Sequence, residues 1–281
     1  MHVPPAAVHS VAAARAREPE LRIVDVRELA AFSLGHLPGA GHVPIAELGM
    51  RRMELPSRKH AVLMVHDQPE LARDAALMLA SRGYERVLWL DCPLANEPSG
   101  HGCTEPAARL WSPSPFLERA LHGAPRGGGR ALDLACGSGR AAVHLARAGW
   151  RVEAWDIDGS ALELAERFAK RQGVRVATRL CDLEAGAIPD PDPAFDAIVV
   201  IRYLHRALFP WIERALAPGG ALVYETFRAG QEQFGHPRRP RHLLEPGELM
   251  RAFPSLRVQI HEESPEHEPP VMARVLAFKP G

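Results

Sequence analysis

The pattern of hydrophobic and polar positions divides the chain into two stretches of alternating strands and helices. In the first stretch, three short apolar runs predict buried strands, at residues 21–26, 61–65 and 86–90. Residues 70–82 have apolar positions at helical spacing and end at Gly83, a typical C-cap, and residues 8–17 have helical composition. Strands that alternate with helices indicate a parallel α/β sheet.

The alternation resumes at Arg130 and continues to the end of the chain. Further strands are predicted at residues 131–135, 152–156, 174–180, 196–201, 221–226, 257–261 and 271–278. Helices are predicted between them at residues 140–148, 160–172 and 208–216. The order of these elements is that of a doubly wound sheet of seven strands. The predicted fold class is α/β with two domains, a small one with a parallel sheet and a larger one that is doubly wound.

The stretch between the two alternating regions has a different composition. It is rich in Pro, Gly and Ser, which is typical of a linker, and a short helix is predicted near residues 114–121. We therefore predict a first domain over residues 1–92, a linker over residues 93–114 and a second domain over residues 115–281.

Composition and charge exclude several classes of protein. Of the 281 residues, 46% are hydrophobic and 24% are charged, which is close to the average for soluble proteins. Lys+Arg and Asp+Glu are equal at 34 each, so neither a nucleic-acid partner nor a membrane partner is expected. The chain contains no apolar run of about 18 residues and no pattern typical of a signal peptide. The four cysteines have no C-x-x-C spacing, so we expect a cytoplasmic protein without a metal site.

A glycine-rich turn in residues 131–140 (ALDLACGSGR) carries the strongest chemical signal. A predicted strand runs into Gly137 and Gly139, and a helix follows at once. Glycines there allow a tight turn and a close approach of a ligand to the backbone. This turn alone also fits a dinucleotide-binding fingerprint.

Three carboxylates at the ends of successive strands indicate whether the ligand is a dinucleotide or another molecule. Asp133 precedes Gly137 by four residues, where a carboxylate favours a ligand with an amino group over a pyrophosphate. Asp156 can accept hydrogen bonds from both ribose hydroxyls. Asp182 can accept one from the exocyclic amine of adenine, with Leu183 beside the ring. This set suits a cationic amino acid that contains adenosine.

With these residues, the segment from about 115 to 280 resembles the class I S-adenosylmethionine-dependent methyltransferases. Their glycine motif is acidic-x-G-x-G-x-G, and Asp133, Ala135, Gly137 and Gly139 match it with alanine at the first glycine. Residues 216–221 (LAPGGA) resemble that family's turn before the fifth strand. The resemblance implies a Rossmann-like domain with S-adenosylmethionine as its cofactor. It implies cofactor contacts at Asp133, Ala135, Gly137, Gly139, Asp156, Ile157, Asp182 and Leu183.

The acceptor side is expected after the fourth and fifth strands, where the candidates are Arg202, Tyr203, His205 and His236. No N-P-P-Y-like motif is present, which argues against methylation of nucleobases. Clustered arginines at 238, 239 and 241 suit an anionic substrate, although a solvated surface loop would look the same. The pattern around them resembles small-molecule methyltransferases that include tellurite-resistance-type enzymes. A thiolate or a chalcogen oxyanion would need no catalytic base, whereas a protonated acceptor would.

Residues 8–92 resemble the rhodanese-like domain through residues 23–28 (IVDVRE), Phe32, residues 35–40 (GHLPGA) and residues 42–44 (HVP). That family carries sulfur on a cysteine after the strand equivalent to residues 61–65. Here His66 stands at that place, Pro69 removes an N–H donor, and Asp67 and Glu70 repel an anion. We predict an inactive domain that binds or scaffolds, in which Asp25, Arg27 and His36 hold the fold.

The leading interpretation is therefore an enzyme that methylates a small molecule, anionic or thiol, and carries a non-catalytic rhodanese-like module. One alternative is a non-catalytic regulator or scaffold that binds S-adenosylmethionine. Another is a sulfur carrier that uses Cys92. The sequence specifies neither the methyl acceptor nor the oligomeric state.

Overall fold

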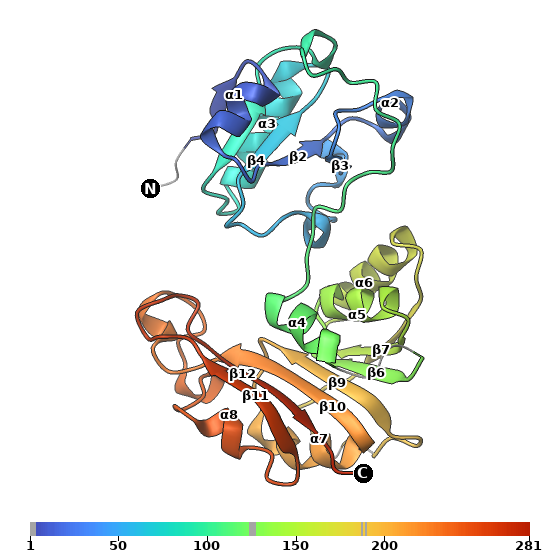
Figure 1. Cartoon of the computed structure of the whole chain (residues 1–281), viewed down its shortest axis with the longest axis vertical. Helices are drawn as coiled ribbons and strands as arrows, with labels where there is room; N and C mark the ends of the chain where they lie inside the picture. The colour runs from blue at the N-terminus through green and yellow to red at the C-terminus, as the bar shows by residue number, and fades with distance from the viewer. Residues whose placement is uncertain (1–3, 124–127, 187, 189) are drawn as a thin grey trace. The chain divides into compact units, whose positions relative to one another are not determined.

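The computed structural model describes residues 4–123, 128–186, 188 and 190–281. The chain folds into two compact units, Met1–Ser112 and Pro113–Gly281, and each unit has its own sheet (Figure 1). The predicted fold class, two α/β domains with different sheets, is confirmed.

Unit 1 is built on a parallel sheet of five strands in the order β1-β5-β4-β2-β3. The strands are β1 Ala6–Val8, β2 Arg22–Asp25, β3 Ala40–His42, β4 Val62–Val65 and β5 Val87–Leu90. The helices are α1 Val11–Arg17, α2 Leu29–Leu34 and α3 Pro69–Ala80. All four residues of the central strand β4 are fully buried, which explains why it is apolar throughout. The strands β1 and β3 were not predicted, because three residues are too few to show a period.

Residues 93–112, where the composition predicts a linker, pack against unit 1. The carboxylate of Glu97 accepts a hydrogen bond from the backbone N–H of Val11 at 3.1 Å and so caps α1. Leu94 and Leu110 are buried in the two hydrophobic clusters of this unit. Pro and Gly prevent regular secondary structure in this stretch, but they do not prevent its apolar side chains from being buried.

Unit 2 contains a seven-stranded sheet in the order β11-β12-β10-β9-β6-β7-β8. The strands are β6 Arg130–Leu134, β7 Arg151–Asp156, β8 Val176–Leu180, β9 Phe195–Ile201, β10 Leu216–Phe227, β11 Arg257–Glu263 and β12 Met272–Phe278. The helices are α4 Pro115–Gly123, α5 Arg140–Arg147, α6 Gly159–Arg171, α7 Phe209–Ala215 and α8 Glu248–Arg251. Strand β12 is antiparallel to both of its neighbours, and the other pairs are parallel. The seven strands predicted from the sequence are all present.

The strand order determines where a ligand can bind. From β6 the chain builds outward to β7 and β8, and it then returns to place β9 and β10 on the other side of β6. In open α/β sheets, ligands bind at such a reversal, outside the carboxyl ends of the parallel strands. We call the residues that follow β6, β7, β8, β9 and β10 the carboxyl edge.

Candidate functional site at the carboxyl edge

The glycine turn between β6 and α5 contains three residues with left-handed backbone. The φ angles are 55° at Ala135, 51° at Gly137 and 81° at Gly139. A Cβ on Gly139 would lie 2.6 Å from the Cβ of Ala165 in α6, so this glycine allows α5 and α6 to pack closely. A Cβ on Gly137 would meet no atom within 4 Å. Gly137 therefore faces open space, and a ligand can approach the backbone there.

Asp133 is 2% exposed and lies in β6 below this turn. Its Oδ2 accepts a hydrogen bond from the backbone N–H of Ala142 at 2.8 Å, which fixes the start of α5. Burial raises the pKa of Asp133 to about 7, and the nearby charge of Asp156 acts in the same direction. Among the described residues, no cation pairs with Asp133. This carboxyl group can therefore receive a cationic group of a ligand.

Asp156 ends β7 and is oriented by two backbone groups. Its Oδ2 accepts from the N–H of Gly137 at 2.7 Å, and its Oδ1 accepts from the N–H of Asp158 at 3.0 Å. These bonds tie the glycine turn to β7 and hold the carboxylate in place. The next residue, Ile157, is 64% exposed. An apolar side chain thus lies in solvent directly beside a fixed carboxylate.

Asp182 and Leu183 follow β8 and differ in exposure. Asp182 is exposed, and its Oδ1 accepts a hydrogen bond from the N–H of Glu184 at 2.9 Å. Leu183 is 5% exposed and belongs to the hydrophobic core. The side chain of Leu183 is therefore packed inside the fold. Leu180, which is 67% exposed, joins Ile157 as the exposed apolar surface at this part of the edge.

Arg202, the first residue after β9, adopts a left-handed conformation with a φ of 60°. Its N–H donates to the backbone oxygen of Glu225 at 2.6 Å, and its guanidinium lies 6.0 Å from the centre of the Phe227 ring. Among the described residues, only Ala135 shares this left-handed backbone without being glycine. Strands β6 and β9 are neighbours, so both strained residues lie at the reversal of strand order. Backbone strain of this kind is often found at functional sites.

Tyr203, a candidate on the acceptor side, follows Arg202 after β9 and is half-buried. Its hydroxyl is closed to solvent and interacts with the carboxylate of Glu184. Burial raises the pKa of Tyr203, and the charges of Glu184 and Asp182 raise it further. Its backbone oxygen accepts a hydrogen bond from the hydroxyl of Tyr224 at 3.0 Å.

The arginine-rich loop consists of residues 228–243 and begins directly after β10. It returns beside β10, since the N–H of Leu244 donates to the backbone oxygen of Phe227 at 3.0 Å. Arg206, which lies just after β9, holds the loop in place. Its guanidinium donates to the backbone oxygens of Arg241 and Leu243 and forms an ion pair with Glu248. The loop is therefore fixed at the carboxyl edge.

The side chains that this loop exposes include His236 and the arginines Arg238, Arg239 and Arg241. None of these arginines is paired with a carboxylate among the described residues. The Nε of Arg241 contacts only the neighbouring His242, at 3.0 Å. Among the described residues, no hydrogen bond or ion pair joins His236 or the half-buried His205 to the carboxylates that follow β6, β7 and β8.

The carboxyl edge therefore has two halves of opposite charge. The acidic half follows β6, β7 and β8 and contains Asp133, Asp156, Asp182 and Glu184. The basic half follows β9 and β10 and contains Arg202, Arg238, Arg239 and Arg241. A cationic ligand is favoured on the first half and an anionic ligand on the second.

The place of the catalytic cysteine in unit 1 is occupied by His66. Its Nδ1 accepts a hydrogen bond from the N–H of Gln68 at 2.9 Å, and burial lowers the pKa of His66, so its ring is neutral at pH 7. Arg27 is 5% exposed and donates to Asp25 at 2.7 Å and to Asp67 at 3.2 Å. The guanidinium near this loop is thus already neutralised by the chain's own carboxylates.

Two further expectations for unit 1 concern structural residues and Cys92. Both ring nitrogens of His36 are within hydrogen-bond distance of backbone oxygens, of Leu37 at 3.0 Å and of Glu105 at 2.9 Å, which confirms its structural role. Burial raises the pKa of Cys92, and Glu97 and Asp91 act in the same direction. The thiol is therefore protonated at neutral pH, which is unfavourable for a sulfur carrier.

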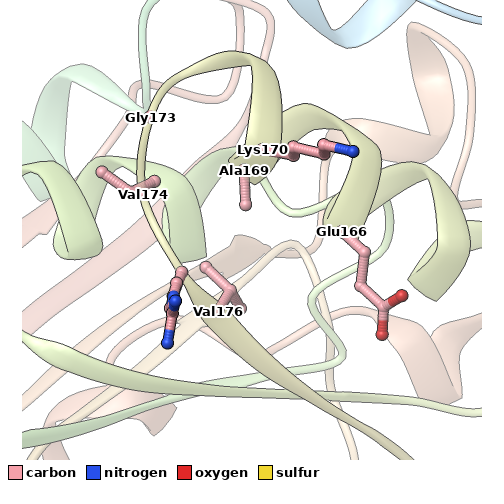
Figure 2. A pocket seen from close by; sticks show the side chains of 7 residues that line it. Glu166, Ala169, Lys170, Gly173, Val174 and Val176 are labelled. Atoms are coloured by element: carbon pink, nitrogen blue, oxygen red, sulfur yellow. The ribbon is translucent and has the colours of Figure 1, made fainter.

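A cavity of about 430 Å³ in unit 2 lies at the opposite end of the strands (Figure 2). It is formed by the end of α6 and the start of β8, with Glu166, Lys170, Val174 and Val176 in its wall. Strand β8 begins at this cavity and ends at Leu180, so the cavity is separate from the site at the carboxyl edge.

The described part of the chain contains neither a membrane-spanning helix nor a cluster of metal-binding side chains. No helix there is long and apolar enough to cross a membrane. No group of three or more His, Cys, Asp or Glu side chains there is arranged to hold a metal ion.

Comparison with known families agrees with this geometry. A family model described as a methyltransferase domain matches residues 131–220, and one described as a rhodanese-like domain matches residues 8–93. The chain thus joins a rhodanese-like domain to a class I methyltransferase domain, a class whose cofactor is S-adenosylmethionine. Both resemblances drawn from the sequence are confirmed.

Relatives match over the second of these domains. The chain is 40% identical to "Ribosomal protein L11 methyltransferase" of Thermus thermophilus over 100 residues. This aligned stretch covers 35% of this chain and 38% of that protein. It is 31% identical over 112 residues to "Ubiquinone biosynthesis O-methyltransferase" of Alkalilimnicola ehrlichii, covering 38% and 45%. It is 26% identical over 117 residues to "Probable S-adenosyl-L-methionine-dependent methyltransferase TehB" of Haemophilus influenzae, covering 42% and 36%. The chain spans less than half the length of these relatives.

Among solved structures, the crystal structure of TehB from Haemophilus influenzae matches with a TM-score of 0.49 and 18% identity, over 60% of this chain and 62% of that one.

Proposed function

We propose that unit 2 transfers a methyl group from S-adenosylmethionine to a small anionic acceptor. The observation that carries this proposal is the division of the carboxyl edge into an acidic half and a basic half. The cofactor is a sulfonium cation that also bears an amino group, so it suits the acidic half. The acceptor then approaches from the basic half, which favours a thiolate, a chalcogen oxyanion or another small anion.

In this proposal, the three aspartates of the acidic half bind the cofactor. Asp156, already oriented by two N–H groups, accepts the ribose hydroxyls, and Asp182 accepts the exocyclic amine of adenine. Ile157 and Leu180 cover the adenine ring in place of the buried Leu183. The turn of Ala135, Gly137 and Gly139 approaches the amino-acid part, whose ammonium group Asp133 balances.

The cofactor supplies an activated methyl group, so the protein mainly orients the two reactants and excludes water. Alignment of reactants can lower a barrier by roughly 7–11 kcal/mol. Arg202 and the arginine-rich loop hold the acceptor anion in line with the methyl group. An acceptor that is already deprotonated needs no base, and for a protonated acceptor His205 or His236 would receive the proton.

The rhodanese-like domain acts in this proposal as a non-catalytic binding or scaffolding module. Support comes from His66 at the place of the cysteine, from the pairing of Arg27 with Asp67, and from the raised pKa of the Cys92 thiol. The four free cysteines are compatible with the cytoplasmic location that we propose.

The binding of S-adenosylhomocysteine to the full chain, measured by calorimetry, tests the part of the proposal that concerns the cofactor. We expect micromolar affinity that Asp156→Ala weakens by about 1.5–3 kcal/mol, the value of hydrogen bonds to a charged group. Asp158→Ala is the matched control, because Asp158 caps α6 and should affect stability rather than affinity. Equal affinity of the wild type and Asp156→Ala would contradict the assignment of Asp156. Absence of binding to the folded wild type would overturn the proposal.

A further inference from the structure

We infer that the outer edge of β8 binds an extended, acidic segment of a partner protein, which joins the sheet as a further strand. This role is separate from the proposed methyl transfer. β8 is the last strand of the seven-stranded sheet and pairs only with β7, in a register that is unbroken from Val176 to Leu180. At the opposite edge, the pairing of β11 with β12 is irregular between Val258 and Ile260. Such an irregularity hinders the addition of a strand, so β8 is the more regular edge of this sheet.

The backbone of β8 offers hydrogen bonds on its outer side. The N–H of Cys181, directly after β8, donates to the backbone oxygen of Asp156 in β7 at 2.9 Å. Alternate residues of a strand direct their backbone groups to opposite sides, so the N–H and C=O groups of Val176 and Thr178 point away from β7. Among the described residues, these outward groups have no hydrogen-bond partner. An extended peptide can pair with them, as in other complexes that form by strand addition.

One face of β8 presents arginines. The guanidinium of Arg179 lies 4.5 Å from the centre of the Trp155 ring in β7. Arg175 lies two residues earlier on the same face, and Arg151 lies at its level at the start of β7. Both Arg151 and Arg175 are exposed, and neither forms an ion pair among the described residues. This face of the edge therefore has an excess of positive charge.

The carboxylate of Glu153, which lies on the same face of β7, does not neutralise these arginines. It accepts hydrogen bonds from the guanidinium of Arg130 at 2.6 Å and from the Nε1 of Trp155 at 3.3 Å. Opposite charges that face each other on adjacent strands attract, and like charges repel. The side chains of an added strand that lie beside Arg175 and Arg179 should therefore be acidic.

The other face of β8 is turned toward α6, because the hydroxyl of Thr178 bonds to the carboxylate of Glu166. The cavity of about 430 Å³ lies on this face, with Val174 and Val176 on its strand side and Ala169 on its helix side (Figure 2). An apolar side chain of an added strand can enter this cavity. The segment that fits β8 thus alternates acidic and apolar residues. A nucleic acid would use the arginines but neither the cavity nor the outward backbone groups.

Hydrogen exchange of the full chain, measured residue by residue by NMR, tests the inference with an eight-residue peptide of alternating Glu and Val. We expect the peptide to slow the exchange of the outward amides of Val176 and Thr178 at least about tenfold. The amides of Ala177 and Arg179 point toward β7, so their exchange should change little. Absence of protection at millimolar peptide would overturn the inference and show that the arginines only prevent the pairing of this edge.

Two substitutions of Thr178 separate backbone pairing from side-chain contacts. Thr178→Pro removes an outward N–H and no hydrogen bond to β7, so it should raise the dissociation constant of the peptide about threefold to tenfold. Thr178→Val also loses the bond to Glu166 but keeps the N–H, so it should bind as the wild type does. Equal weakening in both variants would contradict the pairing of a strand.

Charge reversal tests the acidic character of the partner and does not depend on proline being tolerated. Arg175→Glu should weaken binding of the Glu and Val peptide about threefold to tenfold and should favour a peptide of alternating Lys and Val. Arg257→Glu, at the exposed start of the opposite edge strand β11, is the matched control and should have no effect. Equal effects of the two reversals would contradict the inference. So would a single-stranded oligonucleotide of equal charge that binds as tightly as the peptide.

Discussion

The buried carboxyl group of Asp133 accepts a hydrogen bond from the backbone N–H of Ala142 at 2.8 Å, which joins β6 to the first turn of α5. This one bond fixes the helix that follows the glycine turn. The carboxyl group is buried, and burial raises its pKa to about 7. Both the stability of unit 2 and its affinity for a cation should therefore depend on pH near neutrality.

The free energy of unfolding should fall as the pH rises from about 4 to about 7. The folded pKa of Asp133 lies above the unfolded value of about 3.9, so folding takes up a proton in this range. The slope from this residue is at most about 1.4 kcal/mol per pH unit. Urea denaturation at several pH values measures it. Asp133→Asn keeps an oxygen for the N–H of Ala142 but cannot ionise, so its curve should lack this slope. Parallel curves for the two proteins would contradict the raised pKa.

The left-handed backbone of Ala135 predicts that glycine at this position stabilises the protein. Its φ of 55° is unfavourable for a residue with a Cβ by roughly 1–2 kcal/mol, whereas glycine adopts it freely. Glycine also increases the entropy of the unfolded chain, which costs about 0.4–1 kcal/mol. The substitution Ala135→Gly should therefore raise the free energy of unfolding by about 0.5–1 kcal/mol in chemical denaturation. A loss of stability would mean that the left-handed conformation is not a source of strain.

The hydrogen bond between Glu97 and the start of α1 predicts that residues 93–112 contribute to the stability of unit 1. The carboxylate of Glu97 caps α1 through the N–H of Val11, although it lies 86 positions away in sequence, and it also binds Ser99. We expect Glu97→Ala to lower the free energy of unfolding by about 1–2 kcal/mol, the range for a lost helix cap. Glu105→Ala is the control in the same stretch, because that side chain is exposed. Equal stability of the two variants would indicate that the stretch is a linker after all.

The arginine-rich loop predicts a separation between acceptor binding and cofactor binding. Replacing Arg238, Arg239 and Arg241 together by Gln should raise the KM for an anionic acceptor at least about tenfold, since each hydrogen bond to a charged group is worth about 1.5–3 kcal/mol. The affinity for S-adenosylhomocysteine should stay the same. Arg167→Gln, on the exposed face of α6, is the control. An unchanged KM would identify the loop as a solvated surface loop.

Much of the fold could be read from the sequence because the signals are local. The central strands of unit 2 are apolar runs long enough to recognise. The rule that parallel strands end at one edge then brings Asp133, Asp156 and Asp182 together. The positive φ of Arg202 and the exposed Ile157 lie at this same edge.

The features that the sequence did not predict depend on contacts between distant segments. Strand β1 exists because it pairs with β5, some 80 residues later, and the stretch after residue 92 is ordered by burial of Leu94 and Leu110. Whether Leu183 points inward or outward is decided by the packing of its turn.

Transfer of a labelled methyl group from S-adenosylmethionine to a panel of small molecules tests the central claim most directly. The panel should pair each anion, including thiols and chalcogen oxyanions, with a neutral molecule of similar shape, and it should use the full chain. We predict methylated product from at least one anion, little from its neutral counterpart, and none when Asp156→Ala replaces the wild type at low cofactor concentration. Binding of the cofactor without turnover of any acceptor would contradict the account and indicate a regulatory protein that senses S-adenosylmethionine.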